Sequence, residues 1–270
     1  MPESRNIWAD PALVAGLWER RHSLYEFLAS TAEQFWVAEN EEQIIGYARS
    51  VRADGVRELT EFYVMPSFQS VRVGRELLAR AFPTNGARRR VVIATTDNRA
   101  QARYLKSGVY PRFAIQYLCR KPEPIRVKTD LAFEPALATP ETLTAIRAID
   151  KVVLDFERDA DHEFLLNDRQ AHLYYRGEQV VGYGYVGKGT GPIALLYASD
   201  YPAVLAHAEN EAAERGDEEF GMNVPFINRT AVDYLLARQF QLEGCVGLFM
   251  SDEPFGKFEN YIICYPDFFM

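Results

Sequence analysis

An internal repeat constrains the fold of this chain more than any other sequence feature. Residues 43–47 (QIIGY) return 136 positions later as residues 179–183 (QVVGY), and Pro66 and Pro202 keep the same offset. Ala100 follows an Asn-Arg pair directly, Ala231 follows one after Thr230, and these two alanines lie 131 positions apart. Between the two matching regions, the second copy is therefore five residues shorter than the first. Two copies of domain size in 270 residues indicate a duplicated domain rather than a solenoid.

The segment Lys121-Pro122-Glu123-Pro124 is the predicted boundary between the two copies. Two prolines separated by one acidic residue are unfavourable in both helix and sheet. We therefore expect one domain over residues 1–124 and a second over residues 125–270.

Periodicity predicts an α/β first half. Residues 10–29 carry leucines at helical spacing, and three runs of alternating or apolar residues then predict an antiparallel meander. Pro83 and Gly108 stop two later helices. The expected elements after the first helical region are strands at 35–38, 44–48 and 58–64, a helix at 74–82, a strand at 90–95 and a helix at 99–106.

Composition narrows the class of protein. No apolar run reaches the ~18 residues of a membrane-spanning helix, and residues 1–5 carry acid where a signal peptide carries base. Three cysteines without CxxC spacing suggest reduced thiols. His22, His162, His172 and His207 show no metal-ligand spacing. We expect a cytoplasmic protein with no membrane partner and no metal.

Charge is distributed unequally along the chain. Residues 1–125 carry a net charge of +4 and residues 126–270 a net charge of −12. A mildly basic half suits a polyanionic small molecule, while the acidic half either attracts a cationic substrate or keeps the protein soluble. Neither half is basic enough to indicate a nucleic-acid partner.

A candidate phosphate site lies between Tyr63 and Leu78. There a strand ends, a polar loop follows and a helix begins, so backbone N–H groups and the positive helix terminus converge on one point. Arg72 and Arg75 add charge that suits a diphosphate. An ordinary strand–turn–helix connection would explain the same pattern.

With its surroundings, this segment resembles the GNAT (N-acetyltransferase) superfamily, in which a V-x-P strand end precedes Q/R-x-x-G-x-G/A and an apolar helix. Val64, Pro66, Gln69 and Gly74 match, but Arg72 stands where the family has its first glycine. Arg72 either weakens coenzyme binding or compensates with its charge. The resemblance implies an acetyl-CoA site formed by Phe62, Tyr63, Val64, Gln69, Ser70, Val71, Arg72, Val73, Gly74, Arg75, Asp97 and Ala100.

The same resemblance implies the fold and a catalytic acid. It implies two tandem α/β (α+β) domains, each with a mixed, mainly antiparallel sheet flanked by helices. Residues 97–108 resemble the family's N-x-x-A-x-x-x-Y-x-x-x-G helix, with Asp97 in place of asparagine. Tyr104 then occupies the position of the tyrosine that protonates the departing thiolate. Simple packing of the Tyr104 ring on the sheet is the alternative.

Strand 58–64 supplies two candidate bases for an attacking amine, Glu58 and Glu61. Strict alternation would place Glu58 with Phe62 and Val64 on one face and Glu61 on the other. Glu58 matches the strand glutamate that is the base in the histone-acetylating branch, and two solvated acids remain the alternative. In the family, the backbone of this strand holds the pantetheine arm and polarises the acetyl carbonyl.

The second half resembles the same fold with its site eroded. No glycine loop follows Pro202, and Leu235 occupies the tyrosine position. We expect that the five residues missing from this half are those of the phosphate loop. Residues 125–270 are thus interpreted as a degenerate GNAT domain.

The sequence as a whole predicts an acetyl-CoA-dependent N-acetyltransferase. It acts on a small-molecule or peptide amine by direct transfer in a ternary complex, because no covalent nucleophile is evident and Cys119 is interpreted as a packing residue. A homodimer is left open. The alternative is a non-catalytic acyl-CoA-binding or interaction module, which Arg72, Asp97 and the absence of the family's first strand favour.

Overall fold

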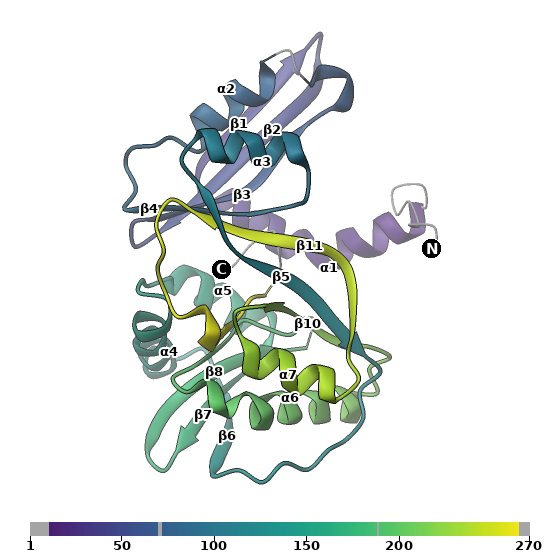
Figure 1. Cartoon of the computed structure of the whole chain (residues 1–270), viewed down its shortest axis with the longest axis vertical. Helices are drawn as coiled ribbons and strands as arrows, with labels where there is room; N and C mark the ends of the chain where they lie inside the picture. The colour runs from purple at the N-terminus through teal and green to yellow at the C-terminus, as the bar shows by residue number, and fades with distance from the viewer. Residues whose placement is uncertain (1–10, 70–71, 188, 265–270) are drawn as a thin grey trace.

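The computed structural model describes residues 11–69, 72–187 and 189–264. Its first half begins with a single long helix and continues with a three-stranded meander (Figure 1). The elements of this half are α1 (Pro11–Ser30), β1 (Ala32–Asn40), β2 (Gln43–Ala53), β3 (Val56–Val64), the 3-10 helix η2 (Pro66–Phe68), α2 (Val73–Ala81), β4 (Arg89–Ala94), α3 (Asn98–Lys106) and β5 (Tyr110–Arg120). The predicted meander and both later helices are confirmed.

The second half has the same order from its second strand onward, preceded by an additional strand and two helices and followed by a short additional strand. Its elements are β6 (Leu131–Ala136), α4 (Pro140–Val153), α5 (Asp159–Asp168), β7 (Gln170–Arg176), β8 (Gln179–Val186), β9 (Ile193–Leu195), the 3-10 helix η3 (Ala198–Asp200), α6 (Tyr201–Arg215), β10 (Phe220–Pro225), α7 (Arg229–Ala237), β11 (Gln241–Ser251), the 3-10 helix η4 (Phe258–Asn260) and β12 (Tyr261–Ile262). Among the described residues, the first half has no counterpart of β6. None of the helices in these ranges has the length and apolarity needed to cross a membrane.

Within the described ranges the strands form two mainly antiparallel sheets. One has seven strands in the order β1-β2-β3-β4-β11-β5-β10, and the other has five in the order β12-β9-β8-β7-β6. Between β3 and β4 the pairing is parallel. The architecture is therefore a mixed α/β fold with two sheets, as expected.

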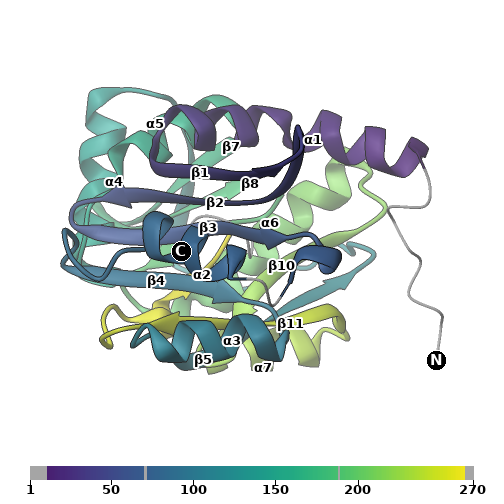
Figure 2. The ribbon, with the colours of Figure 1, turned by 90° about the horizontal axis from the view of Figure 1, so that it is seen from above.

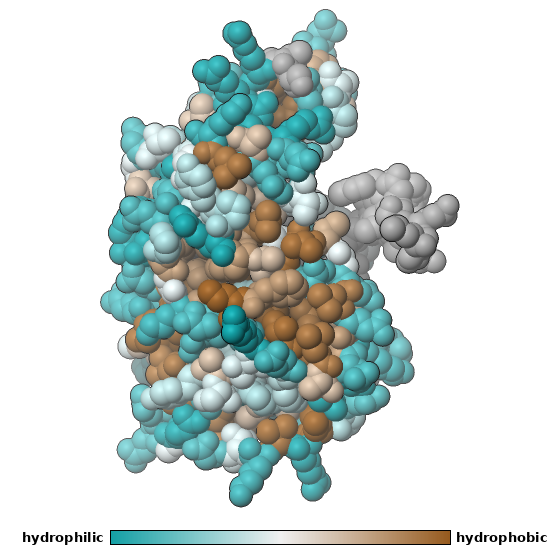
Figure 3. Space-filling model, in the orientation of Figure 1, coloured by the Kyte–Doolittle hydropathy of each residue, from teal (hydrophilic) through white to brown (hydrophobic). Residues whose placement is uncertain are grey.

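The two halves exchange one long strand each, β5 and β11. β11, from the second half, lies between β4 and β5 and pairs antiparallel with both. β5, from the first half, pairs in turn with β10. In Figure 1 these two long strands run side by side across the middle of the molecule, where Figure 3 shows apolar side chains gathered on the surface. The seven-stranded sheet thus contains strands from both sides of the predicted boundary at residue 124.

Helices cover both faces of the first-half strands. On one face Leu77 and Leu78 of α2 and Tyr104 of α3 form a core with Leu59 and Val92. The opposite face carries α1, whose buried leucines join a second core that continues into α4 and α5. Figure 2 shows α1 and α3 on opposite sides of β1–β4.

Strand pairing locates the five missing residues. Gly46 of β2 pairs with Val64 of β3, 18 positions later, whereas Gly182 of β8 pairs with Leu195 of β9, 13 positions later. The deletion therefore lies in the β8–β9 hairpin, and its predicted location in the phosphate loop is wrong.

The match between Pro66 and Pro202 is also wrong. Pro66 begins η2, whereas Pro202 lies in the first turn of α6. α6 nevertheless begins directly after η3, while residues 69–72 separate η2 from α2. The second half thus lacks the phosphate loop, although the five-residue change in offset arises in the β8–β9 hairpin.

Candidate active site

A cavity of about 810 Å³ opens where β3 and β4 separate. The two strands pair only from Val56 to Leu59 on β3 and from Arg89 to Val92 on β4. Their remaining residues diverge and line the cavity, together with the start of α2, most of α3 and one face of α1. The predicted site residues that line it are Glu61, Phe62, Tyr63, Val64, Gln69, Gly74, Asp97, Ala100 and Tyr104.

The other predicted residues lie elsewhere. Arg72, Val73 and Arg75 belong to the turn and first residues of α2 and do not line the cavity. Ser70 and Val71 lie outside the described residues. Glu58 lines a different cavity.

A β-bulge in β3 explains the position of Glu58. Arg49 of β2 pairs with Glu61 and Ser50 pairs with Leu59, so Thr60 is an extra residue, and its hydroxyl donates to the Arg49 carbonyl at 3.2 Å. A bulge reverses the alternation of side chains beyond it. Leu59 consequently packs in the same core as Phe62 and Val64, and the predicted placement of Glu58 on that face is wrong.

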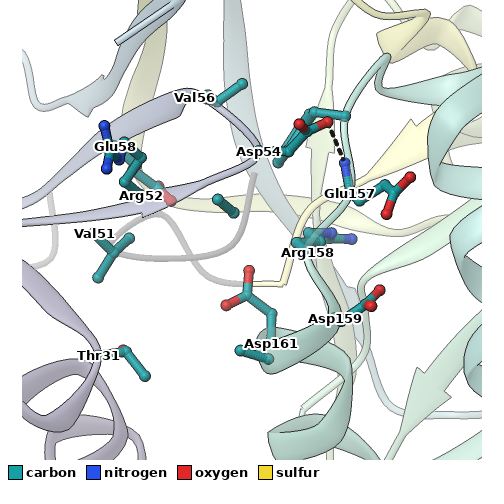
Figure 4. Close-up of a pocket in the computed structure, with 13 residues that line it drawn as sticks. Thr31, Val51, Arg52, Asp54, Val56, Glu58, Glu157, Arg158, Asp159 and Asp161 are labelled. Carbon is teal, nitrogen blue, oxygen red and sulfur yellow. Dashed lines mark hydrogen bonds between the residues drawn. The ribbon is translucent and has the colours of Figure 1, made fainter. Parts of the chain in front are cut away.

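Glu58 lies in a smaller cavity of about 370 Å³ (Figure 4). This cavity lies between the β2–β3 hairpin and the beginning of α5, whose Asp161 also lines it. Of the two candidate bases, only Glu61 lines the larger cavity.

Glu61 lies in an aromatic part of the larger cavity. It forms an ion pair with the buried Arg49, which also donates to the Tyr25 carbonyl at 3.4 Å. Tyr47 and Tyr63 line the same cavity, with ring centroids 6.1 Å apart. A carboxylate among tyrosines suits a cationic or amine-bearing group.

Tyr104 both packs in the core and lines the larger cavity. Its ring is buried in the core with Leu78 and meets Phe62 edge-on at 6.3 Å between centroids. Tyr104 also lines the cavity. Burial, with a smaller contribution from the Asp97 charge, raises the pKa of its phenol, which is therefore protonated at neutral pH. A protonated phenol can donate a proton.

Asp97 caps α3. Its Oδ1 accepts hydrogen bonds from the amides of Arg99 and Ala100 at 2.8 and 2.9 Å, and the bond from Ala100 is the main reason why the pKa of Asp97 is lowered. Asn228 caps α7 in the same way, through the Ala231 amide at 3.1 Å. Asp97 is thus the structural counterpart of Asn228, in the register that Ala100 and Ala231 predict.

The beginning of α2 is compact and strained. Gln69 donates to the Val64 carbonyl at 3.0 Å, which ties the loop to the end of β3. Arg72 is exposed and has a φ of 72°, a left-handed conformation that favours glycine. A Cβ on Gly74 would lie 3.2 Å from the ring tip of Phe62, so close packing favours glycine there.

The corresponding opening in the second half is occupied by the chain itself. β12 pairs with β9, and Ile263 forms a bridge to Asn223 of β10, so residues 261–263 lie between the counterparts of β3 and β4. Asn223 and Asn228 donate to the carbonyls of Cys264 and Tyr261, both at 3.3 Å. These contacts fix the segment between the strands.

Sequence reasoning missed the contribution of α1. Arg21, Leu24, Tyr25 and Leu28 line the larger cavity. Their spacing of i, i+3, i+4 and i+7 is that of one helix face, and it is the signal that would have identified them.

Comparison with known proteins agrees with this geometry. Residues 31–109 match the family described as an acetyltransferase (GNAT) domain. No curated protein matches the chain by sequence. Similar solved structures include a Pyrococcus horikoshii protein assigned as an acetyltransferase, with 15% identity, a TM-score of 0.73 and coverage of 90% of this chain and 83% of that one.

Two further structures are similar over most of this chain. A tandem GNAT protein from the clavulanic acid biosynthesis pathway has 12% identity, a TM-score of 0.51 and coverage of 87% of this chain and 96% of its own. A GCN5-related N-acetyltransferase from Anabaena variabilis has 13% identity, a TM-score of 0.55 and coverage of 90% and 70%. Residues 31–109 therefore match a GNAT acetyltransferase domain, and the chain as a whole shares the fold of these solved structures, a tandem GNAT protein among them.

The smaller cavity yields a pH-dependent prediction. Burial, opposed by the charge of Arg158 and assisted by that of Asp150, raises the pKa of Asp161 from 3.8 to about 7. The folded state therefore holds this proton more tightly than the unfolded chain, and the fold loses stability as pH rises through this range. Asp161→Asn should gain stability over wild type, and this gain should grow by about 2–3 kcal/mol between pH 5 and pH 8.

Urea unfolding at both pH values measures this gain. Glu163→Gln, which removes an exposed acid from the same helix, is the matched control and should show no such growth. Equal stability of Asp161→Asn and wild type at pH 8 would contradict the raised pKa.

Proposed function

We propose that the first half binds acetyl-CoA and transfers its acetyl group to the amine of a small molecule or peptide by direct attack in a ternary complex. The observation that carries this proposal is the cavity between the separated ends of β3 and β4. It is lined on one side by α2 and α3 and on the other by Glu61 and tyrosines. Coenzyme and acceptor can thus approach one point from opposite faces of the sheet.

The α2–α3 side suits the coenzyme phosphates. α2 presents the first-turn amides of Val73 and Gly74, which have no carbonyl of a preceding turn to bind. Arg99, Arg103 and Lys106 of α3 line the cavity and add positive charge. Helix termini and arginines together are a favourable site for a diphosphate.

The divergence of β3 from β4 suits the thioester. Beyond Leu59, β3 has no β4 partner, so its edge faces the cavity. A pantetheine arm laid along this edge would pair with strand backbone groups, as a further strand would. An amide of residues 62–64 directed at the acetyl carbonyl would stabilise the developing oxyanion.

The transfer needs one base and one acid. The amine nitrogen attacks the acetyl carbonyl, a C–N bond forms, the C–S bond breaks and the thiolate leaves. Glu61 accepts the proton of the attacking amine, directly or through water, and Tyr104 donates a proton to the thiolate. Glu61 lines the aromatic side and Tyr104 belongs to α3, which matches this division of roles.

The second half is proposed to be a degenerate domain that binds no coenzyme, since residues 261–263 fill its opening and α6 follows η3 directly. Acetyl-CoA should therefore bind with a stoichiometry of one per chain in calorimetry. Gly74→Val should weaken binding at least tenfold, because its side chain would meet Phe62.

The matched control for this titration is Gly16→Val, since nothing lies within 4 Å of a Cβ at Gly16. This variant should bind as wild type does. Two equivalent sites per chain would contradict the degenerate second half, and unaltered binding by Gly74→Val would place the coenzyme elsewhere.

Tyr104→Phe tests the catalytic acid. With acetyl-CoA and a panel of amines, we expect turnover to fall by about 10- to 100-fold, while acetyl-CoA affinity changes less than threefold, because the hydroxyl acts mainly as thiolate forms. Release of free thiol measures turnover. Tyr110→Phe, at an exposed tyrosine of β5, is the control.

Equal turnover in Tyr104→Phe and wild type would remove Tyr104 from the mechanism. Tight binding of acetyl-CoA without turnover of any amine would instead support the non-catalytic acyl-CoA-binding module.

Arg72→Gly separates backbone strain from charge. Glycine should raise the free energy of unfolding by about 1 kcal/mol, because the left-handed conformation at φ 72° is unfavourable for arginine. Loss of the cation should weaken acetyl-CoA binding up to about tenfold at low salt and reduce its salt dependence. Arg72→Lys, which keeps both charge and strain, should bind as wild type does. Tighter binding by Arg72→Gly would show that arginine obstructs the loop.

A further inference from the structure

A cluster of metal-ligating side chains lies in the second half, apart from the GNAT cavity. His172 is on β7, and His207 and Glu211 are on α6. His207 and Glu211 are four positions apart, so they share one face of the helix. One ligand atom from each of the three residues lies within 4.8 Å of the other two.

The cluster contains buried polar atoms without partners. His172 is only 6% exposed, and its Nε2 lies 3.1 Å from Glu211 Oε1. Its Nδ1 and the Oε2 of Glu211 are both buried and have no hydrogen-bond partner in the described part of the chain. Buried polar atoms are usually satisfied, and a cation bound within the cluster would give the unpartnered Oε2 of Glu211 a partner.

The histidine rings are already oriented. Phe133 of β6 stacks on His207, with ring centroids 4.2 Å apart and an interplanar angle of 4°. The rings of His172 and His207 meet edge-on at 4.9 Å between centroids. Packing therefore fixes both imidazoles before any ligand binds, which lowers the entropic cost of binding.

We propose that His172, His207 and Glu211 form a binding site for a divalent transition metal, with Zn²⁺ as the best chemical match. Two imidazoles and one carboxylate are a common zinc ligand set that leaves a fourth position for water. The metal would join β7 to α6 and so brace the five-stranded sheet against this helix. The sequence predicts no metal because the two histidines lie 35 positions apart, and the fold brings them together.

Titration of the full chain with Zn²⁺ tests the proposal. After chelator treatment and its removal, calorimetry with zinc alone should show one site per chain with a Kd below about 1 μM. His207→Ala and Glu211→Gln should each weaken binding at least tenfold. Both residues are only half-buried, so these variants should fold, which circular dichroism checks.

Two control variants identify the site. His22→Ala removes an exposed histidine of α1, and Glu219→Gln alters a second cluster that could hold a cation, Cys119 with Glu219 and Glu243. Both should bind zinc as wild type does. Zinc should also raise the Tm of wild type but not that of His207→Ala. No binding by wild type, or weaker binding in either control variant with His207→Ala unaffected, would overturn the proposal.

Discussion

The insertion of β11 between β4 and β5 is the interaction on which the candidate site depends. β4 separates from β3 beyond Val92, and its other edge must still satisfy its backbone hydrogen-bonding groups. β11 satisfies that edge from Val91 to Ala94, the region where the cavity opens. The open cavity in the first half is thus held in shape by a strand of the second half. The second half is required for this reason whether or not it has a site of its own.

The two halves differ in what occupies the opening between their diverging central strands. In the first half, the divergent ends of β3 and β4 line a cavity that a coenzyme arm could enter as an additional strand. In the second half, β12 occupies the corresponding position beside β9. Asn260 anchors this segment by donating to the Leu195 carbonyl at 2.7 Å. Backbone groups at a strand edge in the interior need hydrogen-bond partners, and in the second half β12 supplies them to β9.

Local features of this protein were predictable from sequence, and non-local ones were not. The meander, the strand Val56–Val64 and the helix carrying Tyr104 follow from periodicity and helix-stop signals. The sequence places Glu58 on the wrong face of the sheet, because strict alternation of side chains does not reveal Thr60 as an extra residue in the strand. The strand exchange joins segments 100 or more positions apart, so no local pattern reports it.

The second half also braces the strand that carries the candidate base. The loop after α4 contacts the first half, where Arg89 pairs with Asp155 at 2.7 Å and the Glu157 amide donates to Asp54 of the β2–β3 turn at 3.2 Å. This loop is anchored in turn by Asp150, a fully buried carboxylate that accepts from Arg158 Nε at 2.9 Å and bonds His162 Nε2 at 2.7 Å.

Burial alone would raise the pKa of Asp150, but the charges of Arg158 and His162 and the hydrogen bonds with His162 and Tyr183 together exceed this effect and lower the pKa to about 2. The network therefore stays charged, paired and rigid over the whole physiological range. The loop that this network anchors contacts the turn of the β2–β3 hairpin, and the bulge at Thr60 in the same hairpin gives Glu61 its position in the larger cavity. The strand that carries the candidate base is thus linked to a buried ion pair in the second half.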